Sequence, residues 1–149
     1  MKTHLLGCIL CCSLYNAFSQ KIPNSAIDSI VEVIQKVDDN CSISYDSSTF
    51  KNGYGGVTCF YLNKSNQKLV RITEKTILKT KNKTITRNYY FYNDNLIKVE
   101  AEESGNAMKT FYYSFNSPAP NDPTDRGSQF YLNLAKLLQR SFYKKFRTS

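Results

Sequence analysis

The sequence predicts one exported α+β domain in which a helix, an antiparallel sheet and a second helix follow one another. Residues 23–38 and 128–146 repeat their apolar residues at helical spacing. Residues 57–116 alternate in period two and are rich in Thr, Tyr, Phe, Val and Ile, which is strand composition. The breaks inside this region are short enough for hairpins, so we expect a meander of about five antiparallel strands with both helices packed on one face of the sheet.

The N-terminus has the layout of a secretory signal peptide. Lys2 is followed by a short apolar run and by small residues at Ala17 and Ser19. The run is shorter than the roughly 20 apolar residues of a membrane-spanning helix. We therefore expect cleavage between Ser19 and Gln20, with residues 1–19 as signal and residues 20–149 as one secreted or periplasmic domain. A lipoprotein cleavage box at Leu5–Cys8 is the weaker alternative.

Export determines which chemistry the mature domain can contain. Cleavage would remove the single histidine, His4, and three of the five cysteines. Without histidine the domain has neither a Ser-His-Asp triad nor a His-ligated metal site, so we expect no enzyme activity, no metal and no cofactor. The remaining pair, Cys41 and Cys59, predicts a disulfide in an oxidising compartment, and two buried thiols are the alternative.

The charge is basic and unevenly distributed. The chain has 20 Lys and Arg against 12 Asp and Glu, a formal net charge of +8. Two basic blocks, residues 51–99 and 128–149, alternate with two mildly acidic ones. This pattern fits attraction to anionic surfaces, although charge runs are also typical of solvated faces. An exported protein is not expected to bind nucleic acid.

The first helix is predicted from residues 23–38. It begins at the start signals Pro23 to Ser25 and should bury one apolar stripe. That stripe contains Ile27, Ile30, Val31, Ile34 and Val37. After it, residues 42–46 can form a short strand, and the Ser- and Gly-rich residues 47–56 are interpreted as a crossover to the sheet.

The sheet region is divided by its turns. We predict strands near residues 57–63, 68–80, 83–92, 96–103 and 108–116. A weak internal repeat supports this division, because FYLN (60–63) and YFYN (90–93) both lead into an Asn at a turn and then into an alternating strand. Residues 117–127 contain three prolines and form a loop.

The second helix is basic and amphipathic. Its predicted apolar face contains Phe130, Leu134, Leu137, Leu138 and Phe142. Lys136, Arg140, Lys144 and Lys145 lie mostly on the other side. We expect this helix to cover the sheet; peripheral contact with a membrane surface is the alternative.

Alternation also assigns side chains to the two sheet faces. The turn at Asn93–Asn95 places Tyr89 opposite Val99 and Phe91 opposite Ile97, and directs these side chains inward. The same exercise directs inward Phe60, Leu62, Val70, Ile72, Ala101, Phe111, Tyr113 and Phe115. A one-residue bulge would invert part of this assignment.

The outward face carries our candidate binding residues, because tyrosine is enriched at recognition surfaces and cations surround it here. They are Tyr61, Arg71, Lys75, Tyr90, Tyr92, Lys98 and Tyr112. An ordinary solvated face is the alternative interpretation. The one acidic cluster, at Glu100, Glu102 and Glu103, is interpreted as a solvated strand edge rather than a catalytic pair.

AFSQ at residues 17–20 and the hairpin YYFYNDNLIKVE at residues 89–100 resemble those of short exported bacterial proteins of unknown function. The order of helix, antiparallel sheet and helix is similar to that of PepSY-like and small periplasmic inhibitor domains. This resemblance implies binding of another protein through a sheet face. We expect a non-catalytic binding or inhibitor-like module whose partner is a protein or polysaccharide of the cell envelope. The alternative is a structural envelope protein held to anionic surfaces by charge.

Overall fold

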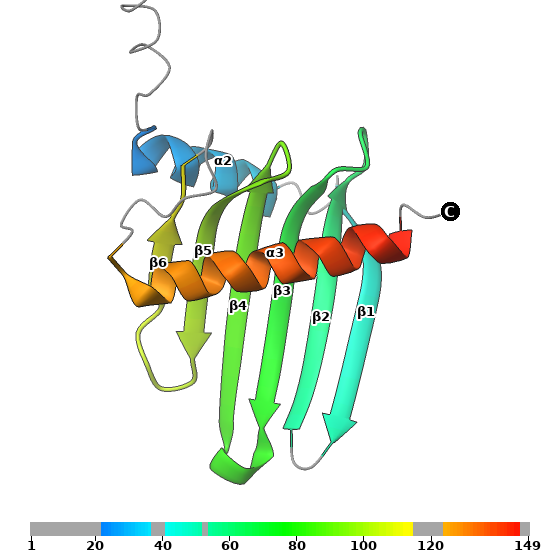
Figure 1. The fold of residues 1–149 in the computed structure, drawn as a ribbon, viewed down its shortest axis with the longest axis vertical. Helices are drawn as coiled ribbons and strands as arrows, with labels where there is room; N and C mark the ends of the chain where they lie inside the picture. Colours follow the sequence, from blue (N-terminus) through cyan, green and yellow to red (C-terminus); the bar gives the residue numbers. More distant parts are fainter. Residues whose placement is uncertain (1–21, 37–40, 52–53, 115–123, 147–149) are drawn as a thin grey trace, which may run out of the picture.

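The fold is a single antiparallel sheet between two helices (Figure 1). The computed structural model describes residues 22–36, 41–51, 54–114 and 124–146, with only the backbone described for 41–51, 54 and 80. The expected signal and its cleavage site lie outside these residues. The elements are α2 (Asn24–Lys36), β1 (Cys41–Lys51), β2 (Tyr54–Asn63), β3 (Leu69–Leu78), the 3-10 turn η2 (Lys79–Lys81), β4 (Lys83–Tyr92), β5 (Asn95–Glu103), β6 (Lys109–Tyr112) and α3 (Arg126–Phe146).

The sheet is a meander, as predicted. Its strand order is β1-β2-β3-β4-β5-β6, and every neighbouring pair is antiparallel. The five predicted strands correspond to β2–β6. The crossover predicted for residues 47–56 is wrong, because β1 runs to Lys51 and pairs with β2 along its length. Ser and Thr are compatible with an edge strand, and so the Ser-rich composition did not prevent pairing.

The β4–β5 turn fixes the central hairpin. Tyr92 pairs with Asn95, and the two residues between them, Asn93 and Asp94, have φ values of 48° and 65°. Positive φ at both central positions defines a type I′ turn, whose twist matches that of the flanking strands. Asn and Asp tolerate this conformation better than other residues with a side chain, which explains the sequence at this turn.

A β-bulge in β5 turns Ile97 to the opposite face of the sheet from the one predicted. Tyr89 pairs with Val99 as expected, but Phe91 pairs with Leu96, which leaves Ile97 as an extra residue. In such a bulge, neighbouring side chains can share a face. Ile97 accordingly packs beside Tyr90, on the side opposite to that of Val99.

The core on one face lies under α3. It contains Phe60, Leu62, Leu69, Ile72, Tyr89, Phe91, Leu96, Val99, Tyr113, Leu132, Ala135 and Phe142. The Phe60 and Phe142 rings lie 5.3 Å apart, and Tyr113 donates a 2.9 Å hydrogen bond to the Ser128 carbonyl. The expectation that the second helix covers the sheet is confirmed.

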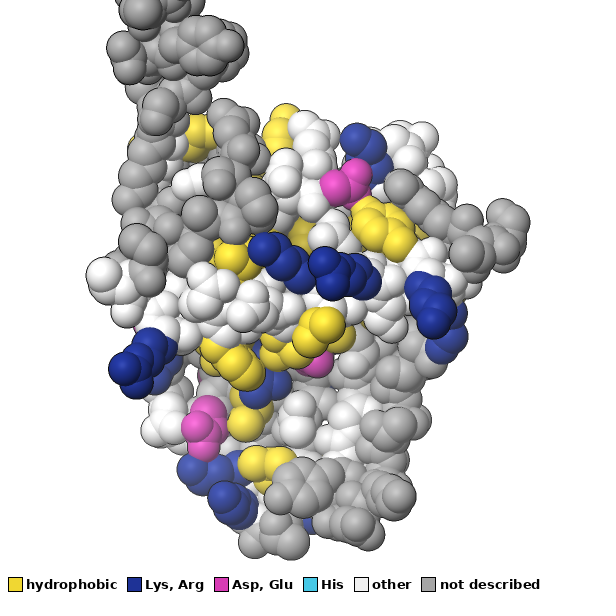
Figure 2. Space-filling view, viewed as in Figure 1, with side chains coloured by type: hydrophobic (Ala, Val, Ile, Leu, Met, Phe, Trp, Pro, Cys, Tyr) yellow, Lys and Arg dark blue, Asp and Glu magenta, His cyan; other side chains and the backbone are white. Residues whose placement is uncertain are grey.

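The buried stripe of α3 differs from the predicted one. Leu132 and Ala135 are buried, whereas Phe130 and Leu137 are exposed on the outer side of the helix. Figure 2 shows this outer side, where Lys and Arg side chains are spread along α3. Apolar residues occur on both sides of this helix, and so its periodicity alone did not identify the packed side.

The other helix, α2, packs on the opposite face of the sheet. Its buried residues Ile27 and Val31 cluster with Tyr90 and Ile97, while Tyr89 belongs to the cluster under α3. Neighbouring residues of a strand point to opposite faces. The prediction that both helices pack on one face is therefore wrong: β4 contacts α3 on one side and α2 on the other.

Candidate functional site

The strand register aligns five of the seven candidate binding residues in one row across the sheet. Tyr61 pairs with Arg71, Arg71 with Tyr90, Tyr90 with Lys98, and Lys98 with Tyr112. We call these five residues the tyrosine row. Lys75 and Tyr92 have the same strand parity as Arg71 and Tyr90, so all seven belong to one face, as the alternation predicted.

Most of the tyrosine row is not open, because α2 covers it. Tyr90 is 1% exposed and Lys98 9%. Tyr112 packs against the α2 cluster. Tyr61 and Arg71 lie farther along the row, where the Arg71 guanidinium carbon is 3.8 Å from the centre of the Tyr61 ring. The prediction of one continuous exposed surface is therefore wrong.

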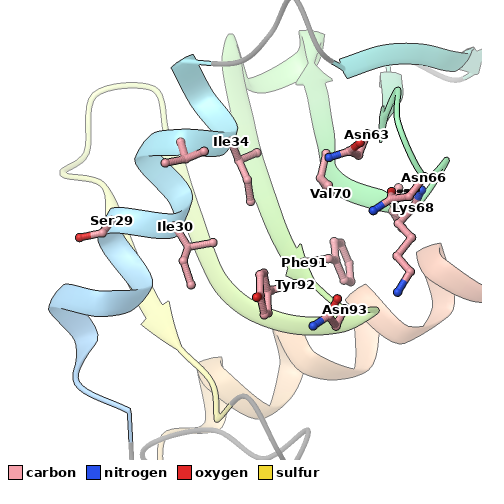
Figure 3. A pocket seen from close by; sticks show the side chains of 12 residues that line it. Ser29, Ile30, Ile34, Asn63, Asn66, Lys68, Val70, Phe91, Tyr92 and Asn93 are labelled. Carbon is pink, nitrogen blue, oxygen red and sulfur yellow. Dashed lines mark hydrogen bonds between the residues drawn. The ribbon is translucent and has the colours of Figure 1, made fainter.

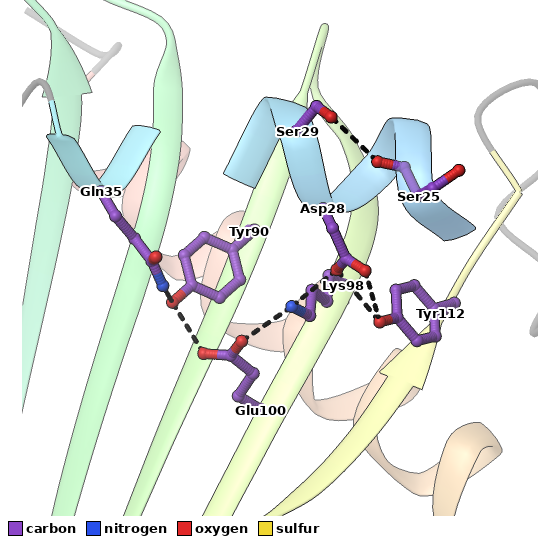
Figure 4. A network of polar contacts seen from close by, with 8 residues as sticks. All are labelled: Ser25, Asp28, Ser29, Gln35, Tyr90, Lys98, Glu100 and Tyr112. Atoms are coloured by element: carbon purple, nitrogen blue, oxygen red, sulfur yellow. Dashed lines mark hydrogen bonds and ion pairs between the residues drawn. The ribbon is translucent and has the colours of Figure 1, made fainter. Parts of the chain in front are cut away.

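A polar network attaches α2 to the row (Figure 4). The Lys98 ammonium lies 2.9 Å from Asp28 Oδ1 and 2.8 Å from Glu100 Oε1. Tyr112 donates its hydroxyl to both carboxylate oxygens of Asp28 at 3.0 Å. Tyr90 donates to Glu100 at 2.9 Å and accepts from Gln35 Nε2 at 2.7 Å.

The network explains how charged groups are tolerated beneath a helix. Burial alone would lower the pKa of Lys98, but its ion pairs with Glu100 and Asp28 raise it above the ordinary lysine value. The hydrogen bond from Lys98 lowers the pKa of Asp28. Burial raises the pKa of Tyr90 to about 12. The tyrosines are therefore neutral hydrogen-bond donors at neutral pH, and the row holds α2 in place.

Beside this network lies an apolar groove, which we call the α2 groove (Figure 3). Its volume is about 430 Å³. It is lined by Ser29, Ile30, Val33 and Ile34 of α2, by Asn63, Asn66, Lys68, Leu69 and Val70 around the β2–β3 turn, and by Phe91, Tyr92 and Asn93 at the β4–β5 turn. Two of its apolar side chains are well exposed, Val33 at 61% and Tyr92 at 44%.

The rim of the groove is built from asparagines. Asn63 Oδ1 accepts the Ser65 backbone N–H at 2.9 Å, and Asn66 Oδ1 accepts the Lys68 backbone N–H at 3.0 Å. These bonds fix which end of each side chain is oxygen, since only the oxygen can accept. The amide nitrogens remain as donors at the edge of the groove.

Only some of the residues that line the groove could be identified from the sequence. Tyr92 was a candidate binding residue, but Val33 lies off the predicted stripe of α2 and was missed. The repeat of FYLN and YFYN did contain a signal: in a meander, alternate turns lie at the same end of the sheet. The repeated turn residues, Asn63 and Asn93, therefore line one groove.

The two cysteines are not brought together. Cys41 pairs with Asn63, whereas Cys59 pairs with Asp46. Asn63 is four residues from Cys59, about 14 Å along a strand. A disulfide requires Cα atoms within about 7 Å. This register does not support the predicted bridge.

Two further observations concern metals and membranes. Among the described residues, no three His, Cys, Asp or Glu side chains are grouped so that they could hold a metal ion. Within the same residues, neither helix combines the length and the apolar character needed to cross a membrane.

The chain was also compared with known proteins. No family model, curated protein or solved structure matches it.

Proposed function

We propose that this chain is an exported, non-catalytic binding module and that the α2 groove is its binding site. The observation that supports the proposal most strongly is the exposure of Val33 and Tyr92 within a concave, mainly apolar groove. Small-molecule and side-chain sites typically have volumes of about 300–1,000 Å³, apolar walls and a few polar groups. The α2 groove has all three properties.

The site differs from the one expected from the sequence. Because α2 occupies the tyrosine row, that row positions the helix, and the helix in turn forms one wall of the groove. The groove should bind an apolar group better than a polysaccharide, because its α2 wall consists of the apolar side chains of Ile30, Val33 and Ile34. The partner we propose is therefore a component of the cell envelope that presents such a group, and an inhibitor-like role would require that this component be a protein.

Substitution of Val33 by Glu tests the site. We expect wild-type protein to bind N-phenyl-1-naphthylamine, an uncharged apolar dye, saturably and at one site per chain. Val33→Glu places a carboxylate in the apolar wall and should weaken binding at least about tenfold. Dye fluorescence measured against protein concentration gives the affinity.

Leu137→Glu is the matched control. Leu137 is also 61% exposed and lies on α3, across the sheet from the groove. It should leave dye binding unchanged, and both variants should keep their unfolding free energy within about 0.5 kcal/mol of wild type. Absence of one-site dye binding, or equal losses in the two variants, would show that the groove is not a site.

A second function is favoured by the charge of α3. The helix contains Arg126, Lys136, Arg140, Lys144 and Lys145 and no acidic residue. Its outer side also exposes Phe130 and Leu137. We propose as the alternative that α3 holds the protein to anionic envelope surfaces, which requires no deep insertion of the helix.

Salt dependence tests this alternative. Binding to vesicles with an anionic lipid should fall steeply between about 0.05 and 0.5 M salt, because the Debye length at 0.1 M is only about 10 Å. Co-sedimentation measures the bound fraction. The double substitution Lys136→Gln with Arg140→Gln should reduce it, whereas Lys75→Gln with Lys81→Gln, which removes two exposed charges elsewhere, should reduce it less. Equal reduction by the two pairs would exclude a specific role for α3.

A further inference from the structure

We infer that the α2 groove binds a carboxylate amphiphile, with the apolar chain against α2 and the carboxylate at the asparagine rim. The inference rests on the proposed function of the groove as a binding site and adds the chemical class of its ligand. Three properties of the groove support it: a one-sided distribution of apolar side chains, a rim of hydrogen-bond donors, and a lining without acidic groups.

The apolar side of the groove is formed by α2 and the strand ends. Ile30 and Ile34 of α2 lie on one side of the groove, and Val70 and Tyr92 lie on the sheet side (Figure 3). Val33 of α2 also lines the groove. These side chains form the wall of an open groove rather than of a closed cavity. An unbranched chain can lie along such a wall, and each methylene placed against it adds apolar contact.

The two asparagines of the β2–β3 turn, Asn63 and Asn66, offer donors rather than acceptors to the groove. The oxygens of Asn63 and Asn66 are already engaged by backbone N–H groups of their own turn. Their amide nitrogens can only donate. A ligand head with several acceptor lone pairs and no need for acceptors in return matches this rim, and a carboxylate is the simplest such head.

Charge favours an anionic head over a neutral or cationic one. Among the described residues that line the groove, Lys68 is the single charged residue and none is acidic. Its four-carbon stem allows the ammonium to move toward a bound anion. The nearest carboxylate of the β4–β5 turn, that of Asp94, accepts a hydrogen bond from Tyr143 of α3. A cationic head would therefore find no counter-charge in the groove.

Three probes with the same twelve-carbon chain test the assignment: dodecanoate, dodecanol and dodecyltrimethylammonium, each kept below its micelle concentration. Isothermal titration of the mature chain should give the tightest binding for dodecanoate and the weakest for the cation. Shortening the carboxylate by one methylene should raise Kd about fourfold while the chain still contacts the wall, at about 0.8 kcal/mol per methylene.

Variants separate the head from the chain. Lys68→Gln should remove most of the preference for dodecanoate over dodecanol and leave dodecanol binding within about twofold. Val33→Glu should weaken all probes except the cation at least about tenfold, and Leu137→Glu should weaken none.

The outcomes distinguish the two proposals. If all three probes bind equally and Val33→Glu weakens the neutral one, the groove is a site but the carboxylate assignment is overturned. If no probe binds, or if Val33→Glu and Leu137→Glu behave alike, the groove is not a binding site and the proposed function is overturned with it.

Discussion

Lys98→Met should lower the free energy of unfolding by about 3–5 kcal/mol, the cost typical of removing one partner from a buried ion pair. The ammonium of Lys98 neutralises Glu100, whose side chain is 11% exposed, and Asp28 of α2. Methionine preserves much of the side-chain volume but leaves both carboxylates without their cation. Denaturant unfolding measures the loss. Lys75→Met, at an exposed position on the same face, should change stability by less than about 0.5 kcal/mol.

The pH dependence of the unfolding free energy provides a further test of this prediction. In the wild type, the pKa of Asp28 is lowered by Lys98, so its contribution to stability is present above the unfolded pKa and is lost as pH falls through the folded pKa. Lys98→Met removes the group that lowers the pKa of Asp28, so the variant lacks this pH-dependent contribution.

The stability difference between wild type and variant should therefore narrow as pH falls through the lowered pKa of Asp28, because the wild type loses this contribution there. The narrowing should begin below about pH 4, the ordinary pKa of an aspartate. A constant difference across this range would mean that the variant fails by lost packing rather than by an unpaired carboxylate.

The same network explains why the position of α2 could not be predicted from its own periodicity. A stripe of Ile and Val residues can pack against either face of a sheet. The choice depends on polar groups that lie far apart in sequence: Asp28 meets Lys98 and Tyr112, and Gln35 meets Tyr90. A tyrosine- and lysine-bearing face was interpreted as outward because its apolar content is low. This face instead binds α2, whose Asp28 carboxylate and Gln35 amide form hydrogen bonds and an ion pair with its tyrosines and lysine.

What could be predicted follows from local rules. Hairpin breaks, strand order and the common face of the tyrosine row depend on short turns and on the period of two. The bulge at Ile97 has no such local signal, since LIKV alternates no differently from its neighbours. The α2 groove could not be predicted because one of its walls is α2, which was predicted on the other face of the sheet.

Two of the leucines on α3, Leu132 and Leu137, test the packing of this helix on the sheet. Leu132 is 3% exposed and packs in the core under α3, whereas Leu137 is 61% exposed on the same helix. Leu132→Ala should lower the free energy of unfolding by about 2–5 kcal/mol, through lost burial and the cavity left behind. Leu137→Ala makes the same chemical change at a solvated position, so its effect should be within about 0.5 kcal/mol. Because helix propensity changes equally in both variants, the difference measures burial under α3 alone. If the two substitutions cost the same, α3 does not cover the sheet in solution, and its basic face and its apolar face are both available to an envelope surface.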